Sequence, residues 1–144
     1  MVQNVSMTKF HAHKDNYGSL IAVETMEDIP FPVKRVYYIY DVEDGRRRGF
    51  HSHRNLHQAL ICVHGRVTIL VKTPYAEENI LLDNPEQALL IGPMVWREMY
   101  DFSEDAVLLV LASEHYTPSD YIRDYSEYEK EAIEYFSFET KKCN

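Results

Sequence analysis

Short apolar runs broken by turn-forming residues alternate along the chain from position 20 to position 112. Residues 33–40 are rich in β-branched and aromatic side chains, which favour a strand. Two further apolar runs flank His64 and Gly65, which predicts a β-hairpin that turns at the glycine. The flanking runs are 60–63 and 66–71, and further runs that predict strands are 80–82, 88–91 and 106–112. Short strands at this spacing, with no helix between them, predict an antiparallel sandwich or jelly roll.

The residues after position 112 are mainly polar and aromatic. The segment 117–120 has proline as its second residue, which is typical of the start of a helix. Tyr121, Ile122, Tyr125 and Tyr128 follow at spacings of one, three and three, which predicts one apolar helix face. We therefore expect a C-terminal helix that packs on the barrel.

Composition narrows the class of protein. A chain of 144 residues is long enough to bury a core, and we expect a single domain over residues 1–144. The 15 basic and 23 acidic residues give a net charge of −8, which disfavours nucleic acid and anionic membranes as partners. Cys62 and Cys143 are too few for a disulfide framework and favour a reducing compartment. We expect a soluble cytoplasmic protein without a membrane span.

One motif has a defined spacing. Gly45 is followed after five residues by His51-x-His53, after four more by Gln58, and after six more by Gly65. This spacing resembles the first motif of the cupins, in which two histidines and a glutamate hold a metal inside a small β-barrel. A glutamine here replaces the carboxylate that would bind a cation. The replacement favours proton transfer by the histidines over metal binding.

A metal site would need further ligands. The second cupin motif commonly adds a histidine downstream of a proline, and the matching stretch here is 92–98. Arg97 lies close to the position of that histidine, and a fixed cation there would repel a metal. Coordination through His57 or Glu98 stays an alternative. We predict no metal and no other cofactor.

Acid–base chemistry is the stronger prediction. His51 and His53 are two residues apart, so on a strand both side chains face the same side. A neutral imidazole is suited to taking a moderately acidic C–H proton near neutral pH, with Tyr37 and Tyr17 as neighbouring phenols. Arg35 alternates with Tyr37 on the predicted strand. An arginine that faces inward favours a phosphate or carboxylate ligand.

Five segments together carry a more specific resemblance. They are DNYGSL (15–20), PVKRVYYI (32–39), RGFHSH (48–53), GPMVW (92–96) and DYIR (120–123). Together they resemble the dTDP-4-keto-6-deoxy-D-glucose 3,4-ketoisomerases of the cupin superfamily. The resemblance implies a homodimeric cupin jelly roll that binds a dTDP-linked 4-keto-6-deoxyhexose and needs no redox cofactor.

The resemblance also implies roles for individual residues. It makes His51 the catalytic base, with His53 and Tyr37 beside it. It makes Arg35 and Arg48 candidates for binding the diphosphate of the substrate. The base takes the C3 proton, which the C4 ketone acidifies, and the enediolate is then protonated at C4.

Two positions bear on the product. Members of the family that make the galacto product carry arginine and histidine where this chain has Tyr17 and Arg97, so both residues are candidates for substrate binding. We therefore expect the gluco-producing type, with dTDP-3-keto-6-deoxy-D-glucose as product. The alternatives are the galacto-producing isomerase, a metal-dependent cupin oxygenase and a non-catalytic sugar-nucleotide-binding cupin.

Overall fold

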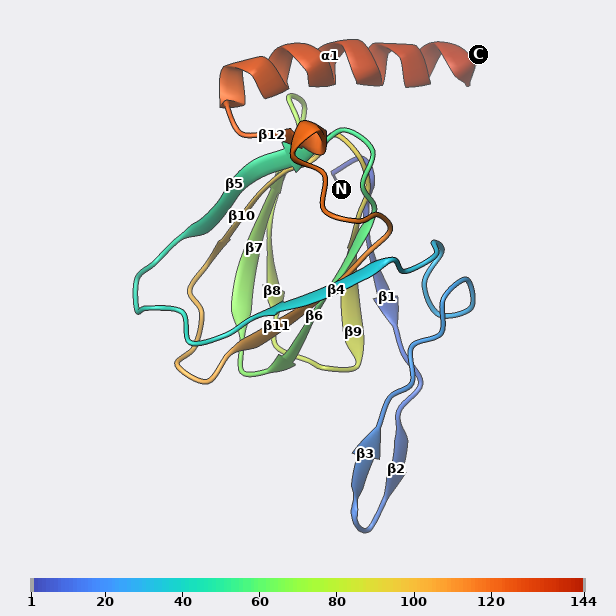
Figure 1. Cartoon of the computed structure of the whole chain (residues 1–144), viewed down its shortest axis with the longest axis vertical. Coiled ribbons are helices and arrows are strands. Elements are labelled where there is room, and N and C mark those ends of the chain that lie inside the picture. The colour runs from blue at the N-terminus through green and yellow to red at the C-terminus, as the bar shows by residue number, and fades with distance from the viewer. Residues whose placement is uncertain (1, 144) are drawn as a thin grey trace.

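The computed structural model describes residues 2–143, and its regular secondary structure is mainly β-strand (Figure 1). The strands are β1 (Val5–Lys9), β2 (His13–Asp15), β3 (Gly18–Leu20), β4 (Arg35–Ile39), β5 (Arg48–His53), β6 (Gln58–His64), β7 (Val67–Lys72), β8 (Glu77–Leu82), β9 (Gln87–Ile91), β10 (Trp96–Tyr100), β11 (Val107–Ala112) and β12 (Tyr121–Ile122). A 3-10 turn, η1 (Pro118–Asp120), precedes β12, and the helix α1 (Tyr125–Lys142) follows it.

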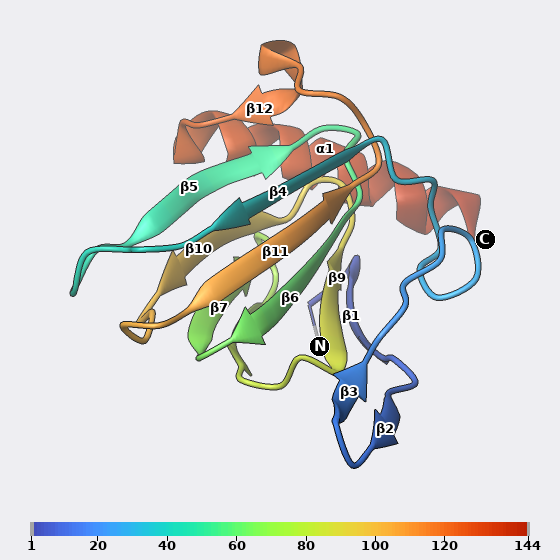
Figure 2. The same ribbon diagram turned by 60° about the horizontal axis from the view of Figure 1, so that its bottom comes forward.

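Two five-stranded antiparallel sheets face each other and enclose the core (Figures 1 and 2). The strand orders are β1-β9-β6-β11-β4 and β12-β5-β10-β7-β8, and β2 pairs with β3 in a separate ribbon. Inward-facing side chains from both sheets, such as Leu60, Val110 and Val71, make one buried cluster. The predicted all-β jelly roll with a C-terminal helix is confirmed.

The central part of the first sheet is apolar on both faces, which explains why β6, β9 and β11 contain continuous apolar runs. On β11, Leu108 and Val110 face the core between the sheets. Leu111 on the same strand packs on the outer face against Phe31, within the segment that leads into β4. Burial on both faces removes the polar alternation that a half-exposed strand would show.

The hairpin predicted at Gly65 is confirmed as the connection between β6 and β7. Gly65 has φ +70°, and a Cβ atom there would lie 2.9 Å from the Cα atom of Ala106. Glycine avoids both the strain of positive φ and this clash.

The helix start predicted at 117–120 was wrong. Tyr121 and Ile122 form β12 and pair with His53 and Ser52 of β5. Helix α1 begins only at Tyr125, where the side chain of the preceding aspartate accepts a hydrogen bond from a backbone N–H in the first turn. The helix packs on the barrel as expected, through Tyr128, Ala132 and Phe136 against Met94, Trp96 and Ile122. No helix within residues 2–143 is long and apolar enough to cross a membrane.

Candidate active site

A cavity of about 460 Å³ lies between β4, at the edge of one sheet, and β5 of the other. Charged and aromatic side chains line most of it. The lining residues are Arg35, Tyr37, Ile39, Arg48, Gly49, His51, Met99, Tyr116, Tyr121 and Arg123. Four residues predicted for the site, Arg35, Tyr37, Arg48 and His51, therefore line one cavity.

The backbone before His51 is shaped by close contact with β10. Gly49 has φ +95°, and a Cβ atom there would lie 2.9 Å from the carbonyl oxygen of Arg97. Phe50 also has positive φ, at +55°, and the pairing of β5 with β10 shifts register between Arg97 and Glu98. Such a bulge redirects the side chains beyond it. It leaves His51 directly opposite Arg97 on the neighbouring strand.

The His51 side chain is neutral at physiological pH. Only 8% of its surface is exposed. Burial, with a further contribution from the Arg97 guanidinium, lowers the pKa of His51 from 6.5 to about 4. Its imidazole therefore keeps a free lone pair in the cavity at neutral pH.

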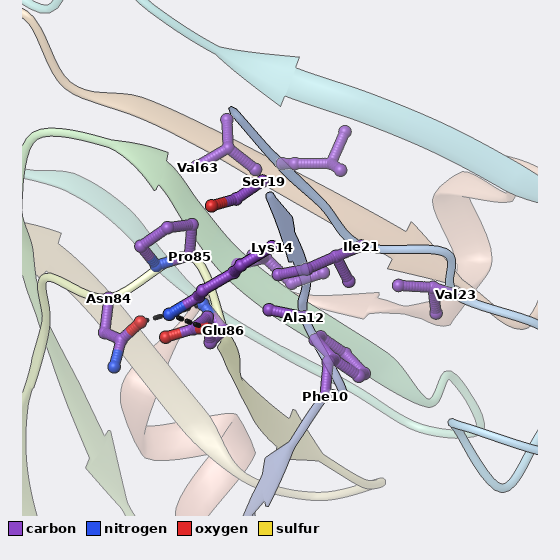
Figure 3. A pocket seen from close by; sticks show the side chains of 12 residues that line it. Phe10, Ala12, Lys14, Ser19, Ile21, Val23, Val63, Asn84, Pro85 and Glu86 are labelled. Atoms are coloured by element: carbon purple, nitrogen blue, oxygen red, sulfur yellow. Dashed lines mark hydrogen bonds and ion pairs between the residues drawn. The ribbon is translucent and has the colours of Figure 1, made fainter. Parts of the chain in front are cut away.

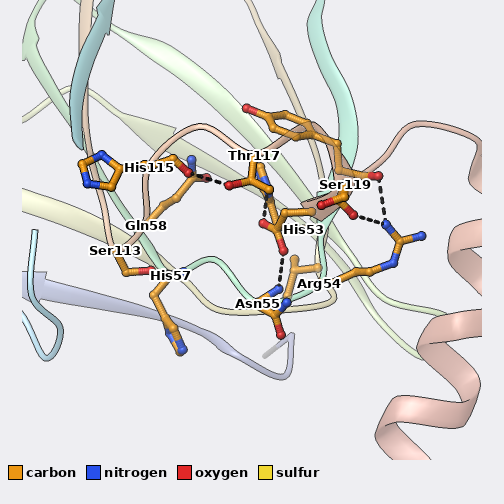
Figure 4. A network of polar contacts seen from close by, with 12 residues as sticks. His53, Arg54, Asn55, His57, Gln58, Ser113, His115, Thr117 and Ser119 are labelled. Atoms are coloured by element: carbon orange, nitrogen blue, oxygen red, sulfur yellow. Dashed lines mark hydrogen bonds and ion pairs between the residues drawn. The ribbon is translucent and has the colours of Figure 1, made fainter. Parts of the chain in front are cut away.

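His53 lies behind His51 and is fully buried, with the two ring centroids 4.9 Å apart. Its Nδ1 atom is 3.0 Å from a carboxylate oxygen of Asp120, whose other oxygen accepts a hydrogen bond from the N–H of Asn55 at 2.8 Å (Figure 4). A carboxylate only accepts, so the proton of the neutral ring resides on Nδ1. Burial lowers the pKa of His53, and its Nε2 has no hydrogen-bond partner among residues 2–143.

Tyr37 and Arg35 extend side by side from β4. The Tyr37 hydroxyl oxygen is 3.1 Å from the Nε2 atom of Gln58, and burial raises the pKa of Tyr37. The Arg35 guanidinium lies 5.4 Å from the centre of the Tyr37 ring and 5.7 Å from that of Tyr116. Its buried Nε atom has no partner in the described part of the chain. A charged donor of this kind is suited to an anionic ligand.

Arg97 differs from the sequence-based expectation of a substrate contact. It is fully buried beneath the cavity and is not among the lining residues. Its guanidinium donates to the side-chain oxygen of Gln58 and, at 2.9 Å, to the carbonyl oxygen of Val95. Burial lowers the pKa of Arg97 to about 10, so it stays charged near neutral pH. Any influence of Arg97 on the substrate must pass through its neighbours.

Tyr17, which was also expected at the site, does not line the cavity of its own chain. It lies in the turn between β2 and β3, on a ribbon that projects away from the barrel, and 98% of its surface is exposed (Figure 1). The Asp15 carboxylate accepts hydrogen bonds from the N–H groups of Tyr17, at 2.7 Å, and Gly18, at 3.1 Å. These bonds stabilise the tight turn at the tip of the ribbon.

The donor atoms present do not suit a metal ion. The oxygen of Gln58 faces the Arg97 guanidinium and its nitrogen faces Tyr37, so neither atom is free beside the histidines. The buried cation of Arg97 would also repel a metal. Among residues 2–143, no three His, Cys, Asp or Glu side chains cluster in a way that could hold an ion.

Comparison with known proteins identifies the family of the chain. The family model described as FdtA: WxcM-like, C-terminal, matches residues 3–133. The chain belongs to the FdtA family. A curated relative from Aneurinibacillus thermoaerophilus, TDP-4-oxo-6-deoxy-alpha-D-glucose-3,4-oxoisomerase, is 46% identical over 116 residues, which cover 81% of this chain and 84% of the relative.

Several solved structures match this chain over nearly its whole length. The 3,4-ketoisomerase QdtA from Thermoanaerobacterium thermosaccharolyticum, in complex with TDP, is 52% identical, with a TM-score of 0.93 over 94% of this chain and 99% of QdtA. A mutant of QdtA in complex with TDP-4-keto-6-deoxyglucose is 51% identical, with a TM-score of 0.92 over 93% and 97% of the two chains. The resemblance to 3,4-ketoisomerases predicted from the sequence is confirmed.

The sequence did not single out several residues of this FdtA-family site. Asp120 positions His53, and Tyr116, Tyr121 and Arg123 line the cavity. The Arg123 guanidinium lies 4.4 Å from the centre of the Tyr121 ring. The segment 120–123 is part of the family resemblance, and this was the signal that could have identified Asp120, Tyr121 and Arg123 as site residues. The helix expected there instead assigned Tyr121 and Ile122 to an apolar packing face.

Proposed function

We propose that this FdtA-family protein is a 3,4-ketoisomerase that converts dTDP-4-keto-6-deoxy-D-glucose to dTDP-3-keto-6-deoxy-D-glucose. The observation that carries the proposal is a buried, neutral His51 in a cavity that three arginines, Arg35, Arg48 and Arg123, also line. The histidine supplies a base for a carbon acid, and the arginines suit the diphosphate of a sugar nucleotide. The activities of its relatives support the same reaction.

The proposed chemistry is an internal exchange of protons. The C4 ketone acidifies the hydrogen on C3, and His51 takes that proton to leave an enediolate. A proton returns to C4, while the hydroxyl on C3 loses its proton to become the new ketone and the oxygen on C4 gains one. Atoms and electrons balance within the sugar, so the reaction needs no oxidant or reductant.

Proton NMR in D2O tests the reaction. Incubation of dTDP-4-keto-6-deoxy-D-glucose with the protein and a metal chelator is expected to convert it to the 3-keto sugar, with deuterium incorporated from solvent. The chelator tests a second expectation, that turnover is independent of metal, because Gln58 and Arg97 occupy positions where a metal would need donors.

Two outcomes would count against these expectations. A substrate that binds but neither exchanges nor isomerises would refute the isomerase and favour a sugar-nucleotide-binding cupin. Stoichiometric zinc, iron or nickel in the active protein, whose removal abolishes turnover, would refute metal independence but leave the isomerase standing.

We further infer a homodimer, because an apolar part of the first sheet's outer face is uncovered in one chain. Val36, Tyr38 and Val63 are exposed on strands of this sheet. A mainly apolar cavity of about 460 Å³ lies between this face and the segment that carries the ribbon, with the ion pair of Lys14 and Glu86 at 2.9 Å beside it (Figure 3). A second copy is the partner that the family resemblance implies.

The dimer would also explain the position of Tyr17. Tyr17 does not line the cavity of its own chain, and the ribbon that carries it projects from the barrel, so we infer that it meets the cavity of a second copy (Figure 1). Sedimentation equilibrium is expected to give twice the chain mass, and Tyr38→Glu on the exposed face is expected to shift it toward one chain mass. A single chain mass for the unaltered protein would contradict the dimer.

Two broader expectations stay proposals. The single domain over residues 1–144 is supported by the family match from residue 3 to residue 133. The cytoplasmic location is supported by the two cysteines, which are free thiols, one buried at Cys62 and one exposed at Cys143.

A further inference from the structure

A buried chain of side chains leads from Arg97 through Gln58 to Tyr37. A guanidinium carries only N–H donors, so the Gln58 atom that faces Arg97 must be the amide oxygen. The amide nitrogen then faces the Tyr37 hydroxyl, 3.1 Å away, and donates to its oxygen. Arg97 thereby sets the orientation of the amide, and the amide sets the direction of the next hydrogen bond.

The direction of that bond leaves the Tyr37 hydrogen free. An amide nitrogen has no lone pair to accept with, so the Tyr37 hydroxyl cannot donate to Gln58. No acceptor for this hydroxyl is present among residues 2–143, and Tyr37 lines the cavity. Burial raises the pKa of Tyr37, so the phenol remains protonated at neutral pH. The hydrogen is therefore available to a ligand in the cavity.

We propose that Arg97 and Gln58 are positioning residues that hold the Tyr37 hydroxyl as a hydrogen-bond donor to the sugar oxygen on which negative charge develops. This inference rests on the proposed isomerase. When His51 removes the C3 proton, charge accumulates on the oxygen attached to C4. A donor already oriented toward that oxygen stabilises the enediolate without reorganisation of the site.

The same geometry gives a reason for glutamine at position 58. A glutamate there would accept from Arg97 and would also accept from Tyr37, because a carboxylate has no donor. The Tyr37 hydroxyl would then point at residue 58 instead of at the substrate. Gln58→Glu has nearly the same shape and keeps Arg97 paired, so it reverses one hydrogen bond and leaves the packing in place.

The test compares Gln58→Glu, Tyr37→Phe and the double variant, all assayed with a chelator so that a new carboxylate beside the histidines binds no metal. Each single variant is expected to lose about 10²-fold in kcat, which is typical of a lost positioned donor. The double variant is expected to lose no more than either, because both remove the same interaction. Dissociation constants for TDP are expected to be unchanged.

A matched control is available on the surface. Asn79 accepts a hydrogen bond from the Tyr100 hydroxyl at 2.7 Å, away from the cavity. Asn79→Asp makes the same amide-to-carboxylate change beside a tyrosine and is expected to leave kcat unchanged. A general effect of added charge would lower kcat in both variants.

Tyrosine NMR supplies a readout that does not depend on turnover. With ¹³Cζ-labelled tyrosine, the Tyr37 signal, assigned by its absence in Tyr37→Phe, is expected to show a higher pKa in Gln58→Glu than in the unaltered protein. An unchanged Tyr37 pKa, parent-like kcat in Gln58→Glu, or fully additive losses in the double variant would overturn the positioning role. Absence of turnover in the unaltered protein would instead refute the proposed isomerase.

Discussion

His51→Asn is expected to lower turnover of dTDP-4-keto-6-deoxy-D-glucose by about two to four orders of magnitude, the usual loss for a positioned general base. Asparagine is close in size and polar, so the protein should fold and still bind TDP through the arginines that line the cavity. The loss should therefore fall on kcat. His64→Asn is the matched control, because His64 is an exposed histidine in the β6–β7 hairpin.

The pH dependence of the unaltered enzyme gives a second check on His51. The base works only when neutral, and burial lowers its pKa from 6.5 to about 4. The rate should therefore be maintained as pH falls through 6.5 and be lost only as pH approaches 4. A fall in kcat/KM centred near 6.5 would show that His51 titrates as an ordinary exposed histidine.

Proton exchange identifies the base directly. If His51→Asn still exchanges the C3 proton with D2O at nearly the parent rate, His51 is not the base. Tyr37, which lines the same cavity, or His53, whose buried Nε2 lacks a partner among residues 2–143, would then be the better assignment.

The unaltered chain is expected to yield the gluco product, and Tyr17→Arg combined with Arg97→His is expected to shift it toward galacto. In a gluco ring the hydrogens on C3 and C4 lie on opposite faces, whereas in a galacto ring they lie on the same face. A single fixed base that moves one proton from C3 to C4 would give galacto. The gluco product therefore needs a second donor, a bound water or a turned intermediate on the other face.

The structure narrows how the two substitutions can act. Arg97 is fully buried and acts on the cavity through Gln58 and Tyr37 and through the effect of its charge on His51, so Arg97→His changes the binding of the sugar indirectly. Tyr17 does not line the cavity of its own chain, so it would act on the sugar through the proposed dimer. Because both would act on one bound sugar, their effects on the product ratio should be non-additive.

The coupling between H4 and H5 of the 3-keto product, formed in ordinary water, measures the configuration at C4. A large diaxial coupling indicates gluco and a small one indicates galacto. Tyr17→Phe, which keeps the ring without the hydroxyl, is the control for loss of aromatic packing. A galacto product from the unaltered chain would refute the stereochemical prediction and leave the isomerase standing.

The sequence determined the features that depend on local periodicity. Residues two apart on a strand share a face, so Arg35 and Tyr37 could be placed together before the structure was known. The apolar runs located the core strands, since a strand buried on both faces carries little polar alternation. Gly65 marked its hairpin because a turn with positive φ favours glycine.

Tertiary structure decided whatever depends on segments that are distant in sequence. His53 and Asp120 are 67 residues apart, and the aspartate reaches the histidine only because residues 121–122 pair with β5 instead of continuing a helix. Arg97 is placed opposite His51 by the pairing of β10 with β5, which buries it below the cavity. Tyr17 is directed away from its own barrel by the ribbon. Pairing between strands that are distant in sequence fixes these positions, and local side-chain periodicity does not show which strands pair.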